Sequence, residues 1–385
     1  MKNYYLWLIK VFDVANPDLH ELMVRFGSPK EINNAFRNNF AAAGKDYAEK
    51  AEKTTIEDAA KLVRTLEQKG ITIITYDDEI YPETLKNTDN PPYVMFAKGN
   101  TELLKTKLLT IGGTRRVTEH TIAVETSVCE ELCGEYTFVA SLAAGCEQLA
   151  CLTAIKHGKG CIEVLPCGFD QEYPKGTQVM RQQILMNGGC LLSEFLPETK
   201  SSNANYMKRA RISGGISKAM IIFQAAANSG SLNAAKYSPA LFFLPPEDVF
   251  SDKYSAAVAG VRNGARLYLS PNSLKPAYDE DYKPNHIKFE SHRKHYKVTT
   301  EETAKTAEKA KVEESAEKDS INDGDFETEL HRVVYNMIAK SDEAVHFDEI
   351  YRNIDSDIPT TNEILLDLEI SGMITAVAGG RYMKV

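Results

Sequence analysis

The sequence predicts an α/β protein: a Rossmann-like, doubly wound, mostly parallel sheet with a small N-terminal helical domain and a C-terminal winged-helix domain. Three observations lead to this prediction. Residues 1–70 repeat apolar residues at helical spacing, residues 105–270 alternate short apolar strands with helices, and residues 326–385 resemble three helices followed by a hairpin. Strands that are apolar throughout and separated by helices are typical of a parallel sheet covered on both faces.

Residues 1–70 are expected to form the N-terminal helical domain, of the SAM or helix-hairpin type. Apolar residues recur at helical spacing over residues 6–12 and 19–26, and Gly27 begins the run that ends the second helix. Lys10 interrupts the apolar start too early for a signal peptide, so we expect an amphipathic first helix. No apolar run approaches the roughly 18 residues that span a bilayer, and we expect a cytoplasmic protein with no membrane association.

Residues 71–300 are expected to form an extended Rossmann-like domain. A β-branched strand over residues 71–75 opens it, and a loop is expected after that strand. In such sheets, ligands bind at the carboxyl ends of the strands, where the strand order reverses. The remaining candidate strands are residues 108–112, 136–140, 161–165, 190–192, 219–223, 241–244 and 265–269.

The net charge of −9 is distributed unevenly along the chain. Residues 301–330 hold four lysines and eleven acidic residues, and they contain the charged linker expected over residues 301–325. Residues 331–385 carry a charge of −4, whereas residues 1–300 carry +2. The body of the protein is therefore not repulsive to a polyanion, and a binding groove would be a local concentration of arginine and lysine.

The seven cysteines and the histidines suggest no metal or cofactor. The cysteine count is odd, there is no C-x-x-C pair, and the only nearby histidine is His157. We expect small core residues in a reducing cytoplasm, no metal site and no cofactor.

A glycine turn comes after the strand predicted for residues 108–112. Gly112 and Gly113 allow the backbone to approach a phosphate closely, and Thr114 and Arg115 come next in the chain. Arg115 is suited to clamp a phosphate, and we expect the next helix to present free N–H groups to it. The pattern is not G-x-G-x-x-G, which argues against a dinucleotide. Glycines that merely turn the chain are the alternative.

Several fragments in order along the chain resemble the DNA-processing protein A (DprA/Smf) family. They are Gly113-Thr114-Arg115, Tyr173-Pro174-Lys175, Arg209-Ala210-Arg211 and Ser229-Gly230-Ser231. The resemblance implies a basic pocket that binds and protects single-stranded DNA. It also implies loading of a RecA-type recombinase during DNA uptake or recombination, a homodimer, and no catalytic residues.

The sequence departs from the family pattern in places. Where the family has an Arg-Gly-Ile-Asp run, this chain has Ala144-Gly145-Cys146-Glu147, so one arginine is missing. The chain is therefore identified as a divergent member. The complete predicted phosphate-binding set is Gly112, Gly113, Thr114, Arg115, Lys175, Arg209, Arg211, Ser229, Gly230 and Ser231.

Alternatives remain for both the residues and the function. Arg209 and Arg211 are also suited to internal salt bridges with Glu194 or Glu147. A nucleotide-binding protein, either a phosphoribohydrolase-like enzyme or a nucleotide sensor, is the alternative function. The enzyme hypothesis is weakened because residues 213–217 lack the Pro-Gly-Gly-x-Gly-Thr run that it needs.

The predicted winged helix is acidic. Its third helix, residues 360–371, carries Glu363, Asp367 and Glu369 and no lysine or arginine. Because this surface repels phosphates, we expect that the helix does not read DNA. A solvated face, a docking site for a protein partner and a cover for the basic groove all remain open.

Overall fold

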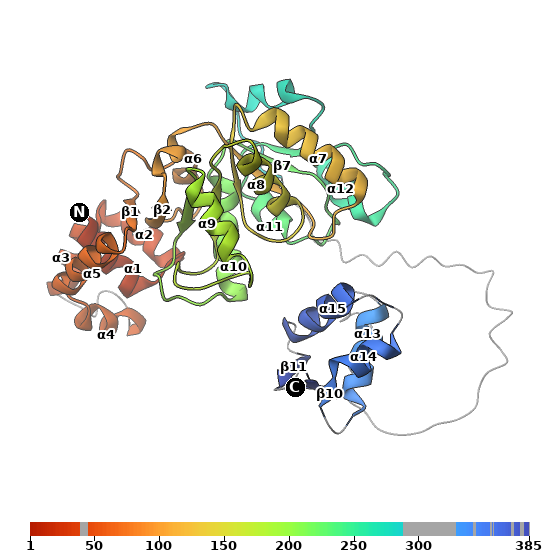
Figure 1. Ribbon diagram of the computed structural model, residues 1–385. Coiled ribbons are helices and arrows are strands. Elements are labelled where there is room, and N and C mark those ends of the chain that lie inside the picture. Colours follow the sequence, from red (N-terminus) through yellow and green to blue (C-terminus); the bar gives the residue numbers. More distant parts are fainter. Residues whose placement is uncertain are drawn as a thin grey trace, which may run out of the picture. The chain divides into compact units, whose positions relative to one another are not determined.

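The computed structural model describes residues 1–38, 45–287 and 329–384, except residues 342, 343, 355, 357, 371, 372 and 378–380 (Figure 1). The chain divides into two compact units, residues 1–293 and 294–385, and each is described by itself. The predicted linker, residues 301–325, lies outside the described residues.

The first unit is built on a nine-stranded, mostly parallel sheet, as predicted. Its order is β1-β2-β6-β5-β4-β3-β7-β8-β9; the strands from β6 to β9 run parallel, and β2 and β1 are added antiparallel at one end. The strands are β1 Thr72–Thr75, β2 Val94–Gly99, β3 Leu108–Gly112, β4 Thr137–Ala140, β5 Ile162–Leu165, β6 Cys190–Ser193, β7 Ala219–Ile222, β8 Leu241–Phe243 and β9 Arg266–Leu267.

Strand β2 was not predicted from the sequence. Two prolines at 91 and 92 suggested that the loop continued, yet Val94, Met95, Phe96 and Ala97 are fully buried. The strand pairs antiparallel with β6, whose Ser193 lies opposite Phe96. An apolar run this short between turn residues is ambiguous in sequence, because only its tertiary partner makes it a strand.

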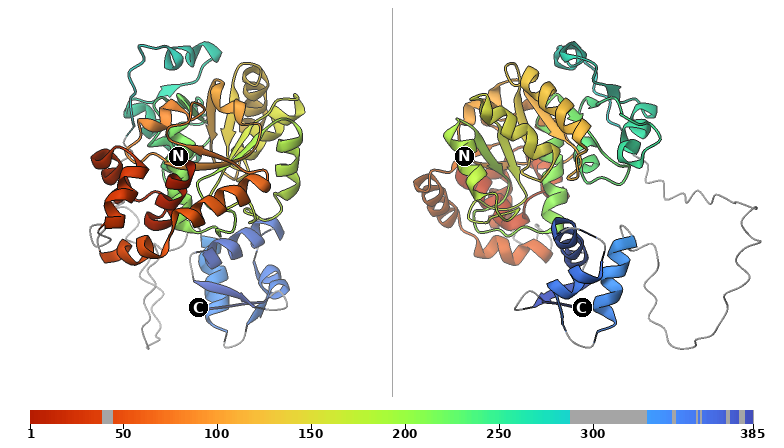
Figure 2. Two further views of the ribbon diagram at one scale, coloured as in Figure 1. Left: turned by 90° about the vertical axis from the view of Figure 1, so that its left-hand side faces the viewer. Right: turned by 45° about the vertical axis from the view of Figure 1, so that its right-hand side comes forward.

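Helices cover both faces of the sheet because successive strand residues point to opposite sides. Ile221 packs with α7, α8 and α9, whereas Met220 packs with α11 and α12 on the other face. Figure 2 shows the sheet between these layers. The helices are α6 Glu83–Lys86, α7 Glu119–Leu132, α8 Cys146–Lys156, α9 Gln178–Met186, α10 Asn203–Gly215, α11 Ser231–Ala235 and α12 Ser255–Arg262. Short 3-10 turns are η2 Thr101–Lys105, η3 Asp252–Tyr254, η4 Pro271–Ser273 and η5 Lys275–Tyr278.

The N-terminal helices pack against the β1–β2 end of the sheet (red in Figure 1). Trp7 and Phe12 share one hydrophobic core with Ile73 and Phe96 of the two strands. Gly27 ends α2 in the left-handed conformation, at φ 75°, and donates its N–H to Met23 O. The helices are α1 Lys2–Phe12, α2 Pro17–Phe26, α3 Pro29–Asn38, α4 Lys45–Lys53 and α5 Ile56–Gln68.

The second unit has the three helices and the hairpin expected of a winged helix. Its elements are α13 Glu329–Ala339, β10 Val345–His346, α14 Phe347–Asn353, α15 Ile358–Ile370, β11 Ile374–Val377 and β12 Arg381–Lys384. The sheet order is β10-β12-β11, and the short strand β10 was not predicted. Val334, Ile338, Ile350 and Leu365 form its core. Among the described residues of the chain, no helix is long and apolar enough to cross a membrane.

Candidate nucleic-acid interface

The strand order reverses at β3. From β3 the chain adds β4, β5 and β6 on one side, and then returns to add β7, β8 and β9 on the other. The loops after β3 and β7 therefore diverge from a shared crevice at the carboxyl edge of the sheet, which is where ligands bind in open α/β sheets. Residues 112–115 and 229–231, both predicted from sequence, flank this point.

Close backbone packing explains the glycines after β3. A Cβ atom on Gly113 would lie 2.4 Å from Cys146 Sγ, and one on Gly145, at φ 89°, would lie 2.2 Å from Thr114 O. The Thr114 carbonyl accepts a hydrogen bond from Cys146 N at 3.2 Å. The loops after β3 and β4 thus pack backbone to backbone, and no larger residue fits at either glycine without a shift.

Gln224 follows β7 and holds the loop over residues 113–118 in place. The sequence interpretation did not predict this role. The main-chain oxygen of Gln224 accepts from Thr114 N at 2.7 Å, and its Oε1 accepts from Thr118 N at 3.0 Å. The side chain is 2% exposed. A glutamine just after an apolar strand was the available signal, but a single amide in a sequence does not reveal which backbone it will hold.

The helix after the glycine loop begins later than expected. Helix α7 starts at Glu119, and its N-cap Thr118 accepts the Thr121 N–H at 3.2 Å. The helix terminus is therefore not directly behind Gly113, as the sequence interpretation assumed. The glycine turn leads instead into a loop over residues 113–118, on which Arg115 is exposed.

The serine–glycine–serine segment lies against the glycine turn. A Cβ atom on Gly112 would be 3.6 Å from Ser231 Cβ, and Ser229 Oγ lies 2.9 Å from Ser231 Oγ. Gly230 is the N-cap of the short helix α11 and has open space where a side chain would stand. The structure thus brings the two predicted segments together at the crevice.

Lys175 and Arg209 form a second group, beyond the β4 loop. Lys175 is exposed on the loop between β5 and α9. On the same loop, the Tyr173 ring meets the Tyr206 ring edge to face at 5.4 Å, and the Arg209 guanidinium lies 4.9 Å from the centre of the Tyr206 ring. Arg209 Nε is buried with no hydrogen-bond partner in the described part of the chain. Between the two groups lies Ala144, where the family pattern has arginine.

Arg211 is placed differently from Arg209. It is 4% exposed, its guanidinium pairs with Glu194, and it donates to Lys208 O at 3.0 Å. Both arginines stand in the middle of α10. Arg211 therefore occupies the internal salt bridge that the sequence left open as an alternative, because its face of α10 packs onto the sheet.

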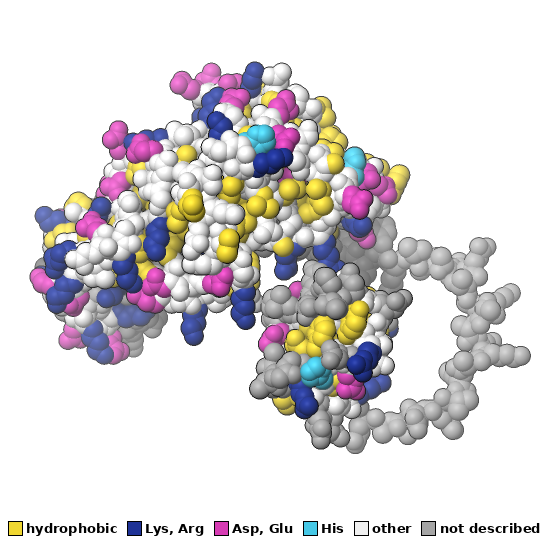
Figure 3. Space-filling model, viewed as in Figure 1, with side chains coloured by type: hydrophobic (Ala, Val, Ile, Leu, Met, Phe, Trp, Pro, Cys, Tyr) yellow, Lys and Arg dark blue, Asp and Glu magenta, His cyan; other side chains and the backbone are white. Residues whose placement is uncertain are grey.

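Three of the predicted cations form no salt bridge in the described part of the chain. Within the described ranges, Arg115, Lys175 and Arg209 lie within 4 Å of no carboxylate oxygen, whereas Arg181 and Arg211 are both paired. Figure 3 shows lysine and arginine side chains projecting from the lower border of the first unit, near α10. Unpaired cations at one edge attract an anion with several charges.

A buried carboxyl lies beneath the glycine loop. Glu125 of α7 is fully buried, and neither of its oxygens has a hydrogen-bond partner in the described residues. The pKa of Glu125 is raised to about 8, mainly by burial and to a lesser extent by the nearby Glu147, while the Cys146 thiol opposes the shift. All seven cysteines are free and buried, and the described residues contain no cluster suited to a metal ion.

This combination defines the class: a Rossmann-like unit with a tightly packed glycine turn after β3 and cations at the same edge of the sheet, followed by a winged-helix domain. The sequence matches the family described as DNA recombination-mediator protein A over residues 72–278, and the DprA winged-helix domain over residues 323–380. The chain belongs to the DNA recombination-mediator protein A (DprA/Smf) family.

Similar proteins are found in several bacteria. The chain is 27% identical to protein Smf of Synechocystis over 335 residues, which is 83% of this chain and 81% of that protein. It is 30% identical to the DNA processing protein DprA of Bacillus subtilis over 222 residues, covering 56% and 74%. The crystal structure of DprA from Streptococcus pneumoniae superposes with a TM-score of 0.60 at 22% identity, covering 71% of this chain and 97% of that chain. The likeness to the Streptococcus pneumoniae structure shows that the two chains share a fold.

Glu125 predicts a pH-dependent stability. Its pKa is raised from 4.5 to about 8 in the folded protein, so the folded state binds a proton that the unfolded state releases. Stability should therefore fall as the pH rises through this range, by about 1.4 kcal/mol per pH unit from this group. Glu125→Gln should remove that dependence.

Urea unfolding of both proteins at pH 6 and pH 8 measures the effect. The stability of the variant relative to the natural protein should rise by about 2 kcal/mol between the two values. A difference that is constant with pH would contradict the shifted titration of Glu125.

Proposed function

We propose that this protein binds single-stranded DNA along the carboxyl edge of its sheet and delivers the strand to a RecA-type recombinase. The observation that carries the proposal is a set of three cations that form no salt bridge within the described ranges and lie on loops and a helix at one edge: Arg115, Lys175 and Arg209. Membership of a family of DNA recombination mediators supports it.

The two groups of residues suit different parts of a DNA strand. The space beside Gly113 is filled by Cys146 Sγ, so the phosphate contact is proposed at Arg115 and not at the glycine backbone. Arg115 is exposed on the loop over residues 113–118, and its guanidinium suits a bidentate phosphate contact. Around Lys175, the partly exposed rings of Tyr173 and Tyr206 offer surfaces on which bases stack. Arg211 contributes indirectly, because its pair with Glu194 fixes α10 and hence Arg209.

The chemistry of the edge favours binding over catalysis. Ser193 and Glu194, which resemble a catalytic pair in sequence, are both committed: Ser193 Oγ donates to Cys167 O at 2.7 Å, and Glu194 holds Arg211. We therefore propose a protein that is not an enzyme and acts without a cofactor. A homodimer is part of the same proposal.

Titration separates this function from its alternatives. Oligo-dT and AMP are titrated against the same preparation, and released adenine is measured. Binding of oligo-dT without binding or cleavage of AMP is the expected result. Tight AMP binding would favour a nucleotide sensor, and free adenine would favour a phosphoribohydrolase.

Alanine substitution of Arg115, Lys175 or Arg209 should each weaken oligo-dT binding by about 1–3 kcal/mol, because each removes one charge-assisted phosphate contact. The slope of log K against log salt should shrink by about 0.7 per variant. Arg64→Ala is the matched control: Arg64 is also exposed, but it lies on α5 away from the edge. Affinities equal to the control in all three variants would refute this interface.

The acidic winged helix yields a separate prediction. Helix α15 carries Glu363, Asp367 and Glu369 and no cation, so it gains nothing from counterion release on DNA. Deletion of residues 301–385 should leave oligo-dT affinity equal or increase it, with any gain greatest at low salt. A clear loss of affinity, with the circular dichroism of the first unit retained, would show that the winged helix contributes to binding.

A further inference from the structure

A buried ion pair stands behind the Lys175 loop. Arg181 projects from α9 into the protein and is 5% exposed, and Glu163 of β5 is 1% exposed. Arg181 Nε lies 3.1 Å from each carboxylate oxygen of Glu163. Two charges taken out of water cost several kcal/mol each, so such a pair rarely stabilises a fold more than two apolar side chains would.

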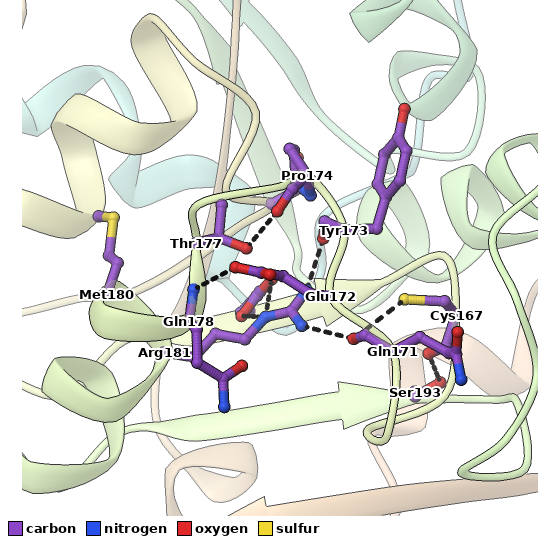
Figure 4. A network of polar contacts seen from close by, with 12 residues as sticks. Cys167, Gln171, Glu172, Tyr173, Pro174, Thr177, Gln178, Met180, Arg181 and Ser193 are labelled. Atoms are coloured by element: carbon purple, nitrogen blue, oxygen red, sulfur yellow. Dashed lines mark hydrogen bonds and ion pairs between the residues drawn. The ribbon is translucent and has the colours of Figure 1, made fainter. Parts of the chain in front are cut away.

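The rest of the guanidinium holds the loop between β5 and α9. Nη1 donates to Gln171 O at 3.0 Å, and Nη2 donates to Tyr173 O at 2.5 Å. The planar fork thus connects one strand carboxylate with two loop carbonyls, which the single ammonium group of a lysine does not reproduce. Figure 4 shows the loop carbonyls converging on the Arg181 side chain.

The tip of the same loop is held by hydrogen bonds between its own residues. Glu172 Oε1 accepts from Gly176 N at 2.9 Å and from Gln178 N at 3.2 Å, and Thr177 Oγ1 donates to Pro174 O at 2.6 Å. These bonds close residues 172–178 into a compact turn around Lys175. Because the turn is internally closed, its placement depends on the bonds that tie residues 171 and 173 to the body of the protein.

The same bonds influence the second cation. Tyr173 contacts Tyr206, and Tyr206 lies under the Arg209 guanidinium. Movement of the Tyr173 backbone would therefore change both the position of Lys175 and the aromatic contact of Arg209.

We propose that Arg181 and Glu163 are positioning residues for DNA binding: the buried pair holds the Lys175 loop in the geometry in which Lys175 and Arg209 meet the same strand. The inference rests on the proposed single-stranded DNA function. Arg181 itself does not contact DNA, because its side chain is buried. The ion pair is retained for the placement of a surface cation and not for the stability of the core.

The test removes both charges together, so that no unpaired charge is left in the interior. The double variant Glu163→Gln/Arg181→Met is compared with Ile184→Ala. Ile184 is one turn further along α9 and fully buried, and its truncation weakens the packing of the same helix without touching the loop carbonyls. The Arg181→Lys variant keeps the positive charge but removes the planar guanidinium. It therefore tests whether the charge alone holds the loop.

Hydrogen exchange of the free protein is the first measurement. Amides of residues 171–178 should exchange at least tenfold faster in Glu163→Gln/Arg181→Met and in Arg181→Lys, but not in Ile184→Ala. Unchanged exchange in the double variant would overturn the proposal. This result does not depend on DNA, so it remains decisive even if the proposed function fails because the natural protein does not bind oligo-dT.

A thermodynamic cycle with Lys175→Ala is the second measurement. The double variant should bind oligo-dT about tenfold more weakly than the natural protein, which is close to the loss expected for Lys175→Ala. The triple variant that also carries Lys175→Ala should bind only slightly more weakly than the double variant. Losses that multiply would mean that the pair acts independently of Lys175, and would contradict the positioning role. Ile184→Ala should bind oligo-dT like the natural protein.

Discussion

Parallel strands end at one edge of a sheet, and the reversal of strand order at β3 makes that edge the place where the loops of this protein meet. The loop after β3 lies against the loop after β4 so closely that Gly113 and Gly145 have no room for side chains. Gln224, just after β7, accepts hydrogen bonds from Thr114 N and Thr118 N of the loop after β3. The interface is thus assembled from backbone contacts, and the cations are added to a frame that is already fixed.

Two kinds of cation lie at the carboxyl edge of the sheet. Arg181 and Arg211 are buried and neutralised by Glu163 and Glu194, whereas Arg115 is exposed and unpaired within the described ranges. A paired guanidinium organises its surroundings, because its planar fork satisfies several acceptors at once. An unpaired one is available to a phosphate. The net charge of −9 therefore does not describe this edge, and under the proposed function Arg115 is the kind of cation that a polyanion would meet there.

Periodicity and turn residues predicted much of the fold. Strand β3 was predicted at its observed bounds, and the winged helix was recognised from its helices and hairpin. Strand β2 escaped because one of its two partners, β6, lies almost a hundred residues away and two prolines precede it. Arg211 was assigned to the phosphate-binding set with the salt bridge to Glu194 left as an alternative, because only the fold decides whether an arginine is buried against a carboxylate. Gln224 carried only the weak signal of an amide just after an apolar strand, and Arg181 carried none, because their roles are set by which main chain the fold brings to them. The binding roles of the predicted residues remain predictions.

Hydrogen-exchange protection on addition of oligo-dT tests the central claim most directly, because it reports where the strand lies on the whole chain. The account predicts protection at residues 112–118, 171–178 and 224–231, which lie on three separate loops of one sheet edge. It predicts none in the N-terminal helices. Protection confined to the winged helix, or absent from all three loops while oligo-dT is bound, would contradict it.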